Sequence, residues 1–362
     1  MSELYIGVMS GTSLDGVDIA LCEIDKISCK LVHAHEYRFN HDIKEEILTI
    51  IAGTTTLEQV GTLNAKLGTL FADSINSFLK QFEINPSTIK AIGLHGQTLW
   101  HQPHAKFPFS MQLGCPNIVH AKTGIQVIAD FRSMDIANGG EGAPFAPAFH
   151  EFLFASLTKK TAVVNIGGMA NITLLQETLK GWDVGAGNVL LDSWIRRCKG
   201  VAYDRDGVFA QSGEVNSELL KSFLKDPYFK KSPPKSTGRE YFNENWIANH
   251  LPMFQTIKDE DIQRTLLELT ALSIQKDVQT SDVSLLIVCG GGAKNIFLMQ
   301  RLNDLCQCEV TSSDTLGVSG DAMEAMAFAW LAYKRVHGAV VNLHSVTGAR
   351  KNSILGGIYG QN

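Results

Sequence analysis

Two stretches of the sequence follow the same plan: an apolar strand, a turn of small residues, and a second strand in which apolar residues alternate with others. The first covers residues 4–24 with MSGTSLDG in its turn, and the second opens at residue 161 as TAVVNIGGMANITLL. Their residues are not similar, but their architecture is. Because each turn is large enough to hold a phosphate, the pattern predicts a duplicated α/β domain with a central cleft between the two copies.

The spacing of apolar residues predicts the other elements. Helices are expected at residues 42–52, 57–82, 116–124, 261–279, 295–305 and 320–336, with Ser319 as the N-cap of the last. Buried strands are expected at residues 89–94, 125–130 and 284–289. Segments rich in glycine, proline or charge are expected to be irregular: 131–147, 225–243 and 341–360. The segment 225–243 is also expected to be an exposed excursion.

Composition excludes several classes of protein. Of the 362 residues, 44% are hydrophobic, which is enough to fill a sizeable core and excludes wholesale disorder. The net charge of −5 argues against a nucleic-acid or anionic-membrane surface, which needs clustered positive charge. We expect no transmembrane helix and no signal peptide. The seven cysteines are scattered, and Cys306 and Cys308 lack the partner ligands of a zinc site, so reduced thiols in a cytoplasmic protein are expected.

Three turns have the composition of a phosphate site: Gly11–Asp18, Asn165–Asn171 and Cys289–Asn295. A Walker motif is absent from the sequence, and the glycine pattern that begins at Gly185 fails the Rossmann fingerprint because Leu190 occupies its last position. Each turn alone could be an ordinary tight turn. Together, in this order, they fit an ATP cleft between two halves.

The glycine- and proline-rich segment 131–147 has the composition of a domain junction or a site loop. We expect an N-terminal domain of residues 1–140, completed by about 340–362 of the C-terminal tail. A C-terminal domain of residues 141–339 would carry the nucleotide-binding turns. Asp183, in WDVGAGN at the end of an expected strand, is either a general base facing a cleft or an aspartate that satisfies its own turn.

Nine motifs in order resemble those of the anhydro-N-acetylmuramic acid kinase family, from residue 5 to about 350: YIGVMSGTSLDGVDIAL, LHGQT, ADFR, GGEGAPFAP, VNIGGMANIT, WDVGAGN, PPKSTGREYF, VCGGGAKN and NLHSVTGA. One departure is His344, where the family has proline. The resemblance implies an actin/hexokinase/Hsp70-like ATPase, with two related ribonuclease H-like α/β domains around a central ATP cleft. It also implies a homodimer.

The resemblance further implies that ATP and Mg²⁺ are used to convert 1,6-anhydro-N-acetylmuramic acid into N-acetylmuramic acid 6-phosphate, a step in the recycling of cell-wall peptidoglycan. Asp183 would take a proton from the water that attacks C1, and the released O6 would attack the γ-phosphate. The residues expected to bind ATP are Gly11, Thr12, Ser13, Leu14, Asp15, Gly16, Val17, Asp18, Asn165, Gly167, Gly168, Gly290, Gly291, Gly292 and Asn295. The Mg²⁺ ligand stays open among Asp15, Asp18 and Asp183.

Four residues are candidates for sugar binding. Arg132 could bind the lactyl carboxylate or could bridge two loops structurally. His95 and Gln97 follow a strand and could bind sugar hydroxyls, although a histidine there is as often a local backbone partner. Glu324 could face the cleft from the last helix or could complement the helix dipole. Lys230, Lys231, Lys235 and Arg239 could lie near the nucleotide, but a solvated loop is expected for them.

Two alternatives remain open from the residues. A levoglucosan kinase would share Asp183 and the ATP turns, because levoglucosan has the same bicyclic acetal without the N-acetyl and lactyl groups. A non-catalytic sugar or nucleotide sensor could use the same fold, although a sensor would not require a general base.

Overall fold

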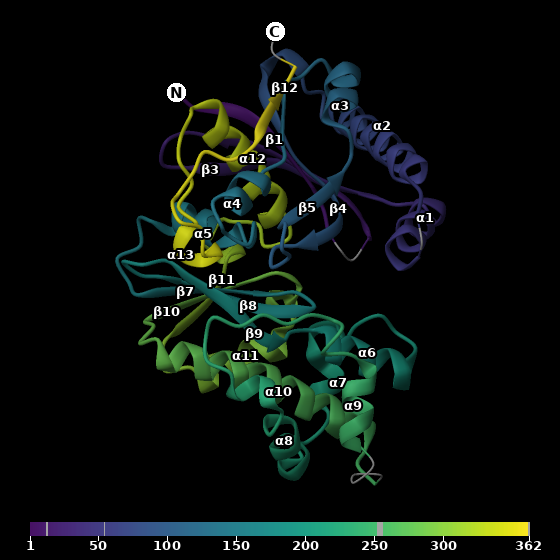
Figure 1. Ribbon diagram of the computed structural model, residues 1–362. Helices are drawn as coiled ribbons and strands as arrows, with labels where there is room; N and C mark the ends of the chain where they lie inside the picture. The colour runs from purple at the N-terminus through teal and green to yellow at the C-terminus, as the bar shows by residue number, and fades with distance from the viewer. Residues whose placement is uncertain (12–13, 54, 252–255, 361–362) are drawn as a thin grey trace. The chain divides into compact units, whose positions relative to one another are not determined.

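The computed structural model describes residues 1–11, 14–53, 55–251 and 256–360, and the chain divides into two compact units (Figure 1). Unit 1 comprises Met1–Ala155 and Ala322–Asn362, and unit 2 comprises Ser156–Asp321. The first unit is therefore built from both ends of the chain, and the second is inserted between them.

Unit 1 is built on a seven-stranded sheet of order β12-β6-β4-β1-β2-β3, with β5 paired to β4. Its strands are β1 (Glu3–Ser10), β2 (Gly16–Ile24), β3 (Cys29–Arg38), β4 (Ile89–Gln102), β5 (Phe109–Leu113), β6 (Val127–Ala129) and β12 (Gly357–Tyr359). Its helices are α1 (His41–Ala52), α2 (Leu57–Gln81), α3 (Pro116–Thr123), α4 (Ser133–Ala137), α5 (Ala146–Phe154), α12 (Met323–Val336) and α13 (His344–Thr347).

Unit 2 is built on a five-stranded sheet of order β11-β10-β7-β8-β9. Its strands are β7 (Thr161–Ile166), β8 (Met169–Leu175), β9 (Lys180–Ala186), β10 (Leu285–Cys289) and β11 (Glu309–Ser312). Its α-helices are α6 (Val189–Lys199), α7 (Val208–Gln211), α8 (Ser217–Leu224), α9 (Glu244–His250), α10 (Asp259–Thr280) and α11 (Ile296–Leu305).

The two sheets share one topology, which confirms the predicted duplication. In unit 1 the order β6-β4-β1 is parallel, and β2 and β3 are added antiparallel. In unit 2 the order β11-β10-β7 is parallel, and β8 and β9 are added antiparallel. Each copy thus opens with an antiparallel pair of strands joined by a turn of small residues.

Local sequence explains the best-defined helix. Thr56 caps α2 by accepting from the Gln59 backbone, while the Gln59 side chain accepts from the Thr56 backbone, which is the reciprocal capping box. One face of α2 is then buried at helical spacing against the sheet of unit 1, through Leu63, Leu67, Phe71, Ile75 and Phe78. The expected helix over 57–82 is confirmed.

Two strand glycines let α12 pack directly on the sheet of unit 1 (Figure 1). A Cβ atom on Gly7 of β1 would lie 1.8 Å from the carbonyl oxygen of Ala325. A Cβ atom on Gly93 of β4 would lie 2.0 Å from that of Phe328. The helix backbone therefore occupies the space that side chains would fill, as is typical of glycine in a strand interior.

The structure differs from several expectations about the ends of elements. The last helix begins at Met323 with Ala322 as its N-cap residue, rather than at residue 320 with Ser319 as its N-cap, and no side chain caps it. The segment 131–147, expected to be irregular, contains α4 and the start of α5, and the tail contains α13 and β12. These elements have three to nine residues, too few for periodicity to reveal.

The division of the chain also lies at positions other than those expected. The break comes at 155/156 rather than at 140/141, and the chain returns to unit 1 at residue 322 rather than at about 340. The physical reason is that α5 packs on α12, and α12 packs on β1, β2 and β4. No helix among the described residues is long and apolar enough to cross a membrane.

Candidate functional site

Asp183 lies on β9, opposite Asn171 of β8. A segment far along the chain holds its other side: the Asp183 amide donates to the Lys235 carbonyl at 3.0 Å, and the Thr237 amide donates to Asp183 Oδ2 at 3.0 Å. The Tyr228 hydroxyl donates to the Asp183 carbonyl at 2.8 Å. The carboxylate is therefore held by residues outside its own turn, which is not the arrangement of an aspartate that satisfies its own backbone.

The surroundings of Asp183 favour a proton acceptor. Burial raises the pKa of its carboxyl, while the Thr237 amide and Lys235 lower it and Glu240 raises it. A carboxylate with a raised pKa accepts a proton more readily near neutral pH than an ordinary surface aspartate does. The direction of this shift is the one that favours proton transfer to the carboxylate.

The segment 225–243 is only in part the exposed excursion that its composition predicts: residues 230–234 and 239–241 are exposed, but its aromatic residues are largely covered. Tyr228, Phe229 and Phe242 are buried in the core of unit 2, and Lys235 Nζ lies 4.8 Å from the centre of the Tyr228 ring. The aromatic residues within the basic stretch were the available signal, because buried aromatic rings contribute strongly to a core. Thr237, which holds the carboxylate of Asp183, was not predicted as a site residue because this segment was expected to be exposed.

The structure brings the second and third turns together at the carboxyl ends of neighbouring strands. β7 and β10 are parallel, with Asn165 opposite Cys289. A Cβ atom on Gly290, whose φ is +76°, would lie 2.3 Å from Asn165 Oδ1, and one on Gly292 would lie 2.4 Å from the side chain of Ile166. These glycines allow the close approach of two backbone turns, and their left-handed or crowded positions exclude larger residues.

The turn after β9 joins the same cluster. The Gly167 carbonyl accepts from the Asn188 amide at 2.8 Å, and the Gly168 carbonyl accepts from the Gly187 and Val189 amides at 2.9 and 3.0 Å. Asn295, one of the residues predicted to bind ATP, caps α11: its Oδ1 accepts from the Leu298 amide at 2.9 Å. That oxygen therefore has a structural role. Gly291 lies in the short 3-10 helix that follows β10.

The first turn belongs to unit 1. Thr12 and Ser13 lie outside the described residues. Leu14 and Val17 are buried, so any contact of theirs with a ligand would come from the backbone. Gly16 is needed for strand pairing, since a Cβ atom there would lie 2.5 Å from the Tyr37 carbonyl. The carboxylates of Asp15 and Asp18 are exposed.

His95 and Gln97 support the start of this turn. Gln97 Oε1 accepts from the Ser10 hydroxyl at 2.6 Å, and Gln97 Nε2 donates to the Gly11 carbonyl at 3.3 Å. His95 Nδ1 lies 3.1 Å from the Ser10 carbonyl, and its Nε2 lies 2.8 Å from Arg132 Nη2. Because a guanidinium only donates, Nε2 accepts and the proton of the neutral ring is on Nδ1. Both side chains thus have backbone partners, the second of the two roles considered for them.

Arg132 is engaged within unit 1. Nη1 donates to the Gly142 carbonyl at 2.8 Å, Nη2 donates to His95, and the guanidinium lies 5.2 Å from the centre of the Phe145 ring. Burial lowers the pKa of Arg132 to about 10, and Glu324 acts in the opposite direction. Glu324, in the first turn of α12, reaches solvent but is crowded by protein, which raises the pKa of its carboxyl while Arg132 lowers it.

Two buried histidines predict a loss of stability in acid. Burial lowers the pKa of His95 to about 3 and that of His150 to about 4, whereas an unfolded imidazole titrates near 6.5. Below about pH 6.5 the unfolded chain therefore binds more protons, and each histidine lowers the free energy of unfolding by about 2 kcal/mol between pH 6.5 and pH 5. We expect the variant H95Q/H150Q to lose less of its thermal midpoint than the wild type between pH 7 and pH 5.

The contributions of the other titrating groups cancel when the wild type is compared with H95Q/H150Q, because both proteins contain those groups. Asp192, whose pKa burial raises to about 6, acts in the opposite sense because its folded form binds a proton more readily, but it is present in both proteins. An equal loss of thermal midpoint in the two proteins would contradict the prediction.

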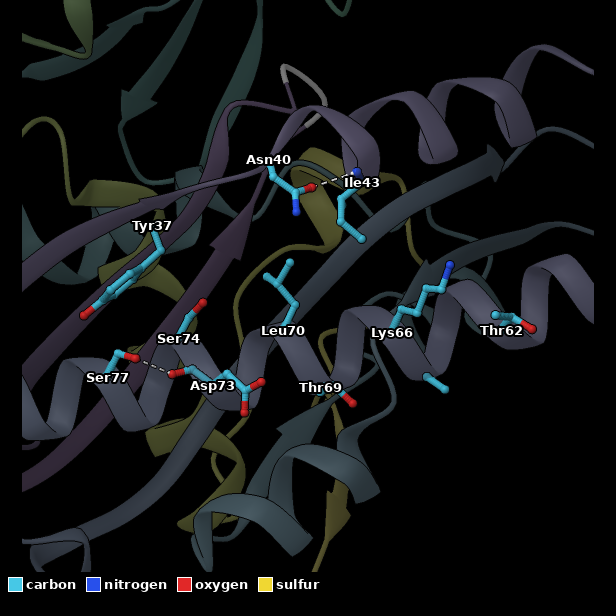
Figure 2. A pocket seen from close by; sticks show the side chains of 11 residues that line it. Tyr37, Asn40, Ile43, Thr62, Lys66, Thr69, Leu70, Asp73, Ser74 and Ser77 are labelled. Carbon is cyan, nitrogen blue, oxygen red and sulfur yellow. Dashed lines mark hydrogen bonds between the residues drawn. The ribbon is translucent and has the colours of Figure 1, made fainter.

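A groove of about 790 Å³ lies elsewhere on unit 1 (Figure 2). It is lined by residues of α2 together with residues at the end of β3 and the start of α1: Tyr37, Asn40, Ile43, Thr62, Ala65, Lys66, Thr69, Leu70, Asp73, Ser74 and Ser77. Its lining includes none of the predicted site residues. We assign it no part in the chemistry.

The described residues contain no group of three or more His, Cys, Asp or Glu side chains arranged to hold a metal ion. Mg²⁺ bound with a nucleotide needs only one or two carboxylates besides phosphate oxygens and water. The carboxylate of Asp15 in unit 1 and that of Asp183 in unit 2 are each of the type that such a metal accepts.

The duplicated sheets, each with a turn of small residues between its first two strands, define the class of the protein: two related α/β domains of the actin/hexokinase-like (ribonuclease H-like) type. The likeness to one solved structure, component A of the (R)-2-hydroxyglutaryl-CoA dehydratase of Acidaminococcus fermentans, concerns this fold alone. Its TM-score is 0.50 at 13% identity, over 93% of this chain and 100% of that one. The predicted fold class is confirmed.

Sequence comparison gives the family. A model described as Anhydro-N-acetylmuramic acid kinase matches residues 3–361. A Sulfurovum sp. (strain NBC37-1) protein of that name is 56% identical over 360 residues, 99% of either chain. A Vibrio vulnificus (strain CMCP6) protein of the same name is 48% identical over 364 residues, 99% of this chain and 98% of that one. The chain belongs to the anhydro-N-acetylmuramic acid kinase family, as the motifs predict.

Proposed function

We propose that this chain uses ATP and water to convert 1,6-anhydro-N-acetylmuramic acid into N-acetylmuramic acid 6-phosphate and ADP. The observation that carries the proposal is the setting of Asp183, whose carboxylate is fixed by the Thr237 amide and has a raised pKa. Membership of the family supplies the substrate, because its relatives are named for this sugar acid.

The reaction needs one base because O6 of the anhydro sugar is already bonded to C1. Asp183 takes a proton from water as the water oxygen forms its bond to C1, and the C1–O6 bond breaks. O6 then forms a bond to the γ-phosphorus, and the bond from that phosphorus to the bridging oxygen of ADP breaks. The first half resembles the base half of an inverting glycosidase, and phosphoryl transfer replaces its general acid.

The three turns are proposed to hold ATP. In unit 2, β7 and β10 end side by side, so the turns at Asn165–Gly168 and Gly290–Gly292 form one patch of closely packed backbone. Backbone amides in such turns bind phosphate oxygens. The turn Gly11–Asp18 of unit 1 is proposed to contribute to the same nucleotide. Mg²⁺ on the phosphates would neutralise part of their charge when bound.

The geometry favours a positioning role for three of the four proposed sugar residues. His95 and Gln97 hold the backbone carbonyls of Ser10 and Gly11, and Arg132 holds His95 and the Gly142 carbonyl. Glu324 keeps access to solvent beside this network and is the residue among the four that we propose to contact the sugar.

We further propose that the protein acts in peptidoglycan recycling in the cytoplasm as a homodimer. Its consumption of ATP supports the location, because ATP is available there, and the family resemblance supports the dimer and the pathway.

The proposed chemistry predicts where an isotope goes. With Mg-ATP and the anhydro sugar in ¹⁸O-water, we expect ADP release with ¹⁸O on C1 of the product and none in its phosphoryl group, by mass spectrometry of fragments. Unlabelled product kept in the same water for the same time corrects for exchange at C1.

The alternatives have distinct outcomes in the same assay. Label in the phosphoryl group would contradict attack at C1. Turnover of levoglucosan alone would keep the mechanism but change the substrate. If neither sugar leads to ADP release, a non-catalytic sensor is favoured.

A further inference from the structure

Arg239 places an exposed cation beside the second turn of unit 2. A side chain at Gly168 would begin 3.5 Å from Arg239 Nη2 and 3.6 Å from Nε, so the guanidinium lies over the bare backbone of that glycine. Arg239 also follows two residues after Thr237, whose amide holds Asp183. One short segment thus contributes both the support of the proposed base and a cation at a proposed phosphate turn.

The guanidinium is not consumed by an internal ion pair. In the described part of the chain, no carboxylate lies within 4.0 Å of it. Asp192, at the start of α6, is half-buried and its charge interacts with Arg239 and Arg196, but it forms no salt bridge with either. The five donors of a guanidinium in a fixed fork are suited to a planar or tetrahedral oxyanion.

A second polar group beside Asp183 also lacks a partner. The Thr237 hydroxyl oxygen is buried, and no hydrogen-bond partner for it occurs among the described residues. A buried hydroxyl without a partner is costly in a folded protein, and a bound molecule is one way to satisfy it. Within the described ranges, Thr237 therefore carries a hydroxyl without a partner next to the amide that holds the base, and Arg239 carries a guanidinium without an ion pair two residues later.

We propose that Arg239 binds the phosphoryl group while it passes from ATP to O6 of the sugar. This inference rests on the proposed function. The transferring group has three equatorial oxygens whose charge must be stabilised, and an arginine fork can donate to two of them. Its place over Gly168 distinguishes it from Lys230, an exposed lysine of the same segment for which no such contact with a turn is found.

The test compares two ligands in the full-length protein. 1,6-Anhydro-N-acetylmuramic acid and N-acetylmuramic acid 6-phosphate share the lactyl carboxylate, but only the second has a phosphoryl group. We expect R239A to lower kcat by about 100-fold. By calorimetry we expect it to weaken binding of the 6-phosphate at least about tenfold and to leave the Kd of the anhydro sugar within about twofold. R239K keeps the charge without the fork and should lie between R239A and the wild type. K230A is the matched control.

Each other outcome overturns the inference in a recognisable way. Equal weakening of both ligands would assign Arg239 to the lactyl carboxylate. Wild-type kcat and Kd values in R239A would show a solvated arginine. If the wild-type protein itself neither binds nor converts the anhydro sugar, the proposed function fails and this inference fails with it. In the first two outcomes the wild type is active, so the two failures are distinguishable.

Discussion

Replacing Asp183 with asparagine is expected to lower kcat between about 100-fold and 10,000-fold, the range over which general bases contribute. The carboxamide keeps the size of the carboxylate and can still accept the hydrogen bond from the Thr237 amide, so the local geometry should survive. It cannot take the proton of the attacking water. Steady-state kinetics with the anhydro sugar and calorimetric binding of ATP measure the two effects, and we expect the Kd of ATP to stay within about twofold.

A neighbouring variant distinguishes a lost base from a disturbed site. Glu240 raises the pKa of Asp183 by like-charge repulsion, so E240Q should lower that pKa and move the acidic limb of the kcat profile to lower pH. Near-normal turnover in D183N would remove Asp183 from the role of base, and an acidic limb that stays in place in E240Q would remove the proposed influence of Glu240 on it.

Replacing Gly7 with alanine is expected to destabilise unit 1 by about 3 kcal/mol, the upper end of the usual cost of overpacking, because a backbone has no flexible side chain that could move aside. The new methyl group would lie 1.8 Å from the Ala325 carbonyl oxygen and 2.6 Å from the Ala329 nitrogen, and α12 must move away from β1. Since a protein of two units need not unfold in one step, hydrogen–deuterium exchange is the better measurement. Peptides of β1 and α12 should exchange much faster than in the wild type.

Gly61 provides the matched substitution. It lies on an exposed face of α2, and an added Cβ atom there would meet nothing within 4 Å. G61A should stabilise the helix by about 0.5–1 kcal/mol through its better helix propensity. Faster exchange in α10 of unit 2 as well as in α12, or a G7A protein as stable as the wild type, would contradict the assigned packing.

Sequence periodicity predicted the elements that depend on local pattern. The helices α2, α10 and α11 and the duplicated strands were all expected, because each is long or strongly patterned. The sheet on which α12 packs could not be predicted, since its apolar face would suit either unit. Gly7 and Gly93 were the available signal, because glycine inside a buried strand often marks the close approach of another backbone.

The candidate site was predictable only where local sequence identifies a residue, and not where its contacts come from distant segments. Asp183 was identified from its own neighbours in WDVGAGN. Its support comes from Thr237 and Lys235, more than 50 residues later in the chain, and no local pattern connects them. The contacts of His95 with Ser10 and Arg132 are also long-range, so the sequence left its role open between sugar binding and backbone support.

The insertion of unit 2 within unit 1 has a consequence for synthesis on the ribosome. The central strand β1 is made before unit 2, but the helix that covers its glycine face, α12, and the edge strand β12 are made after it. Unit 2 is contiguous, so it can fold while the chain is still being translated. The early strands of unit 1 must wait with an uncovered apolar face until the part of unit 1 that follows unit 2 has been made. Nascent chains that stop before residue 322 are therefore expected to depend on chaperones, although their second unit is already folded.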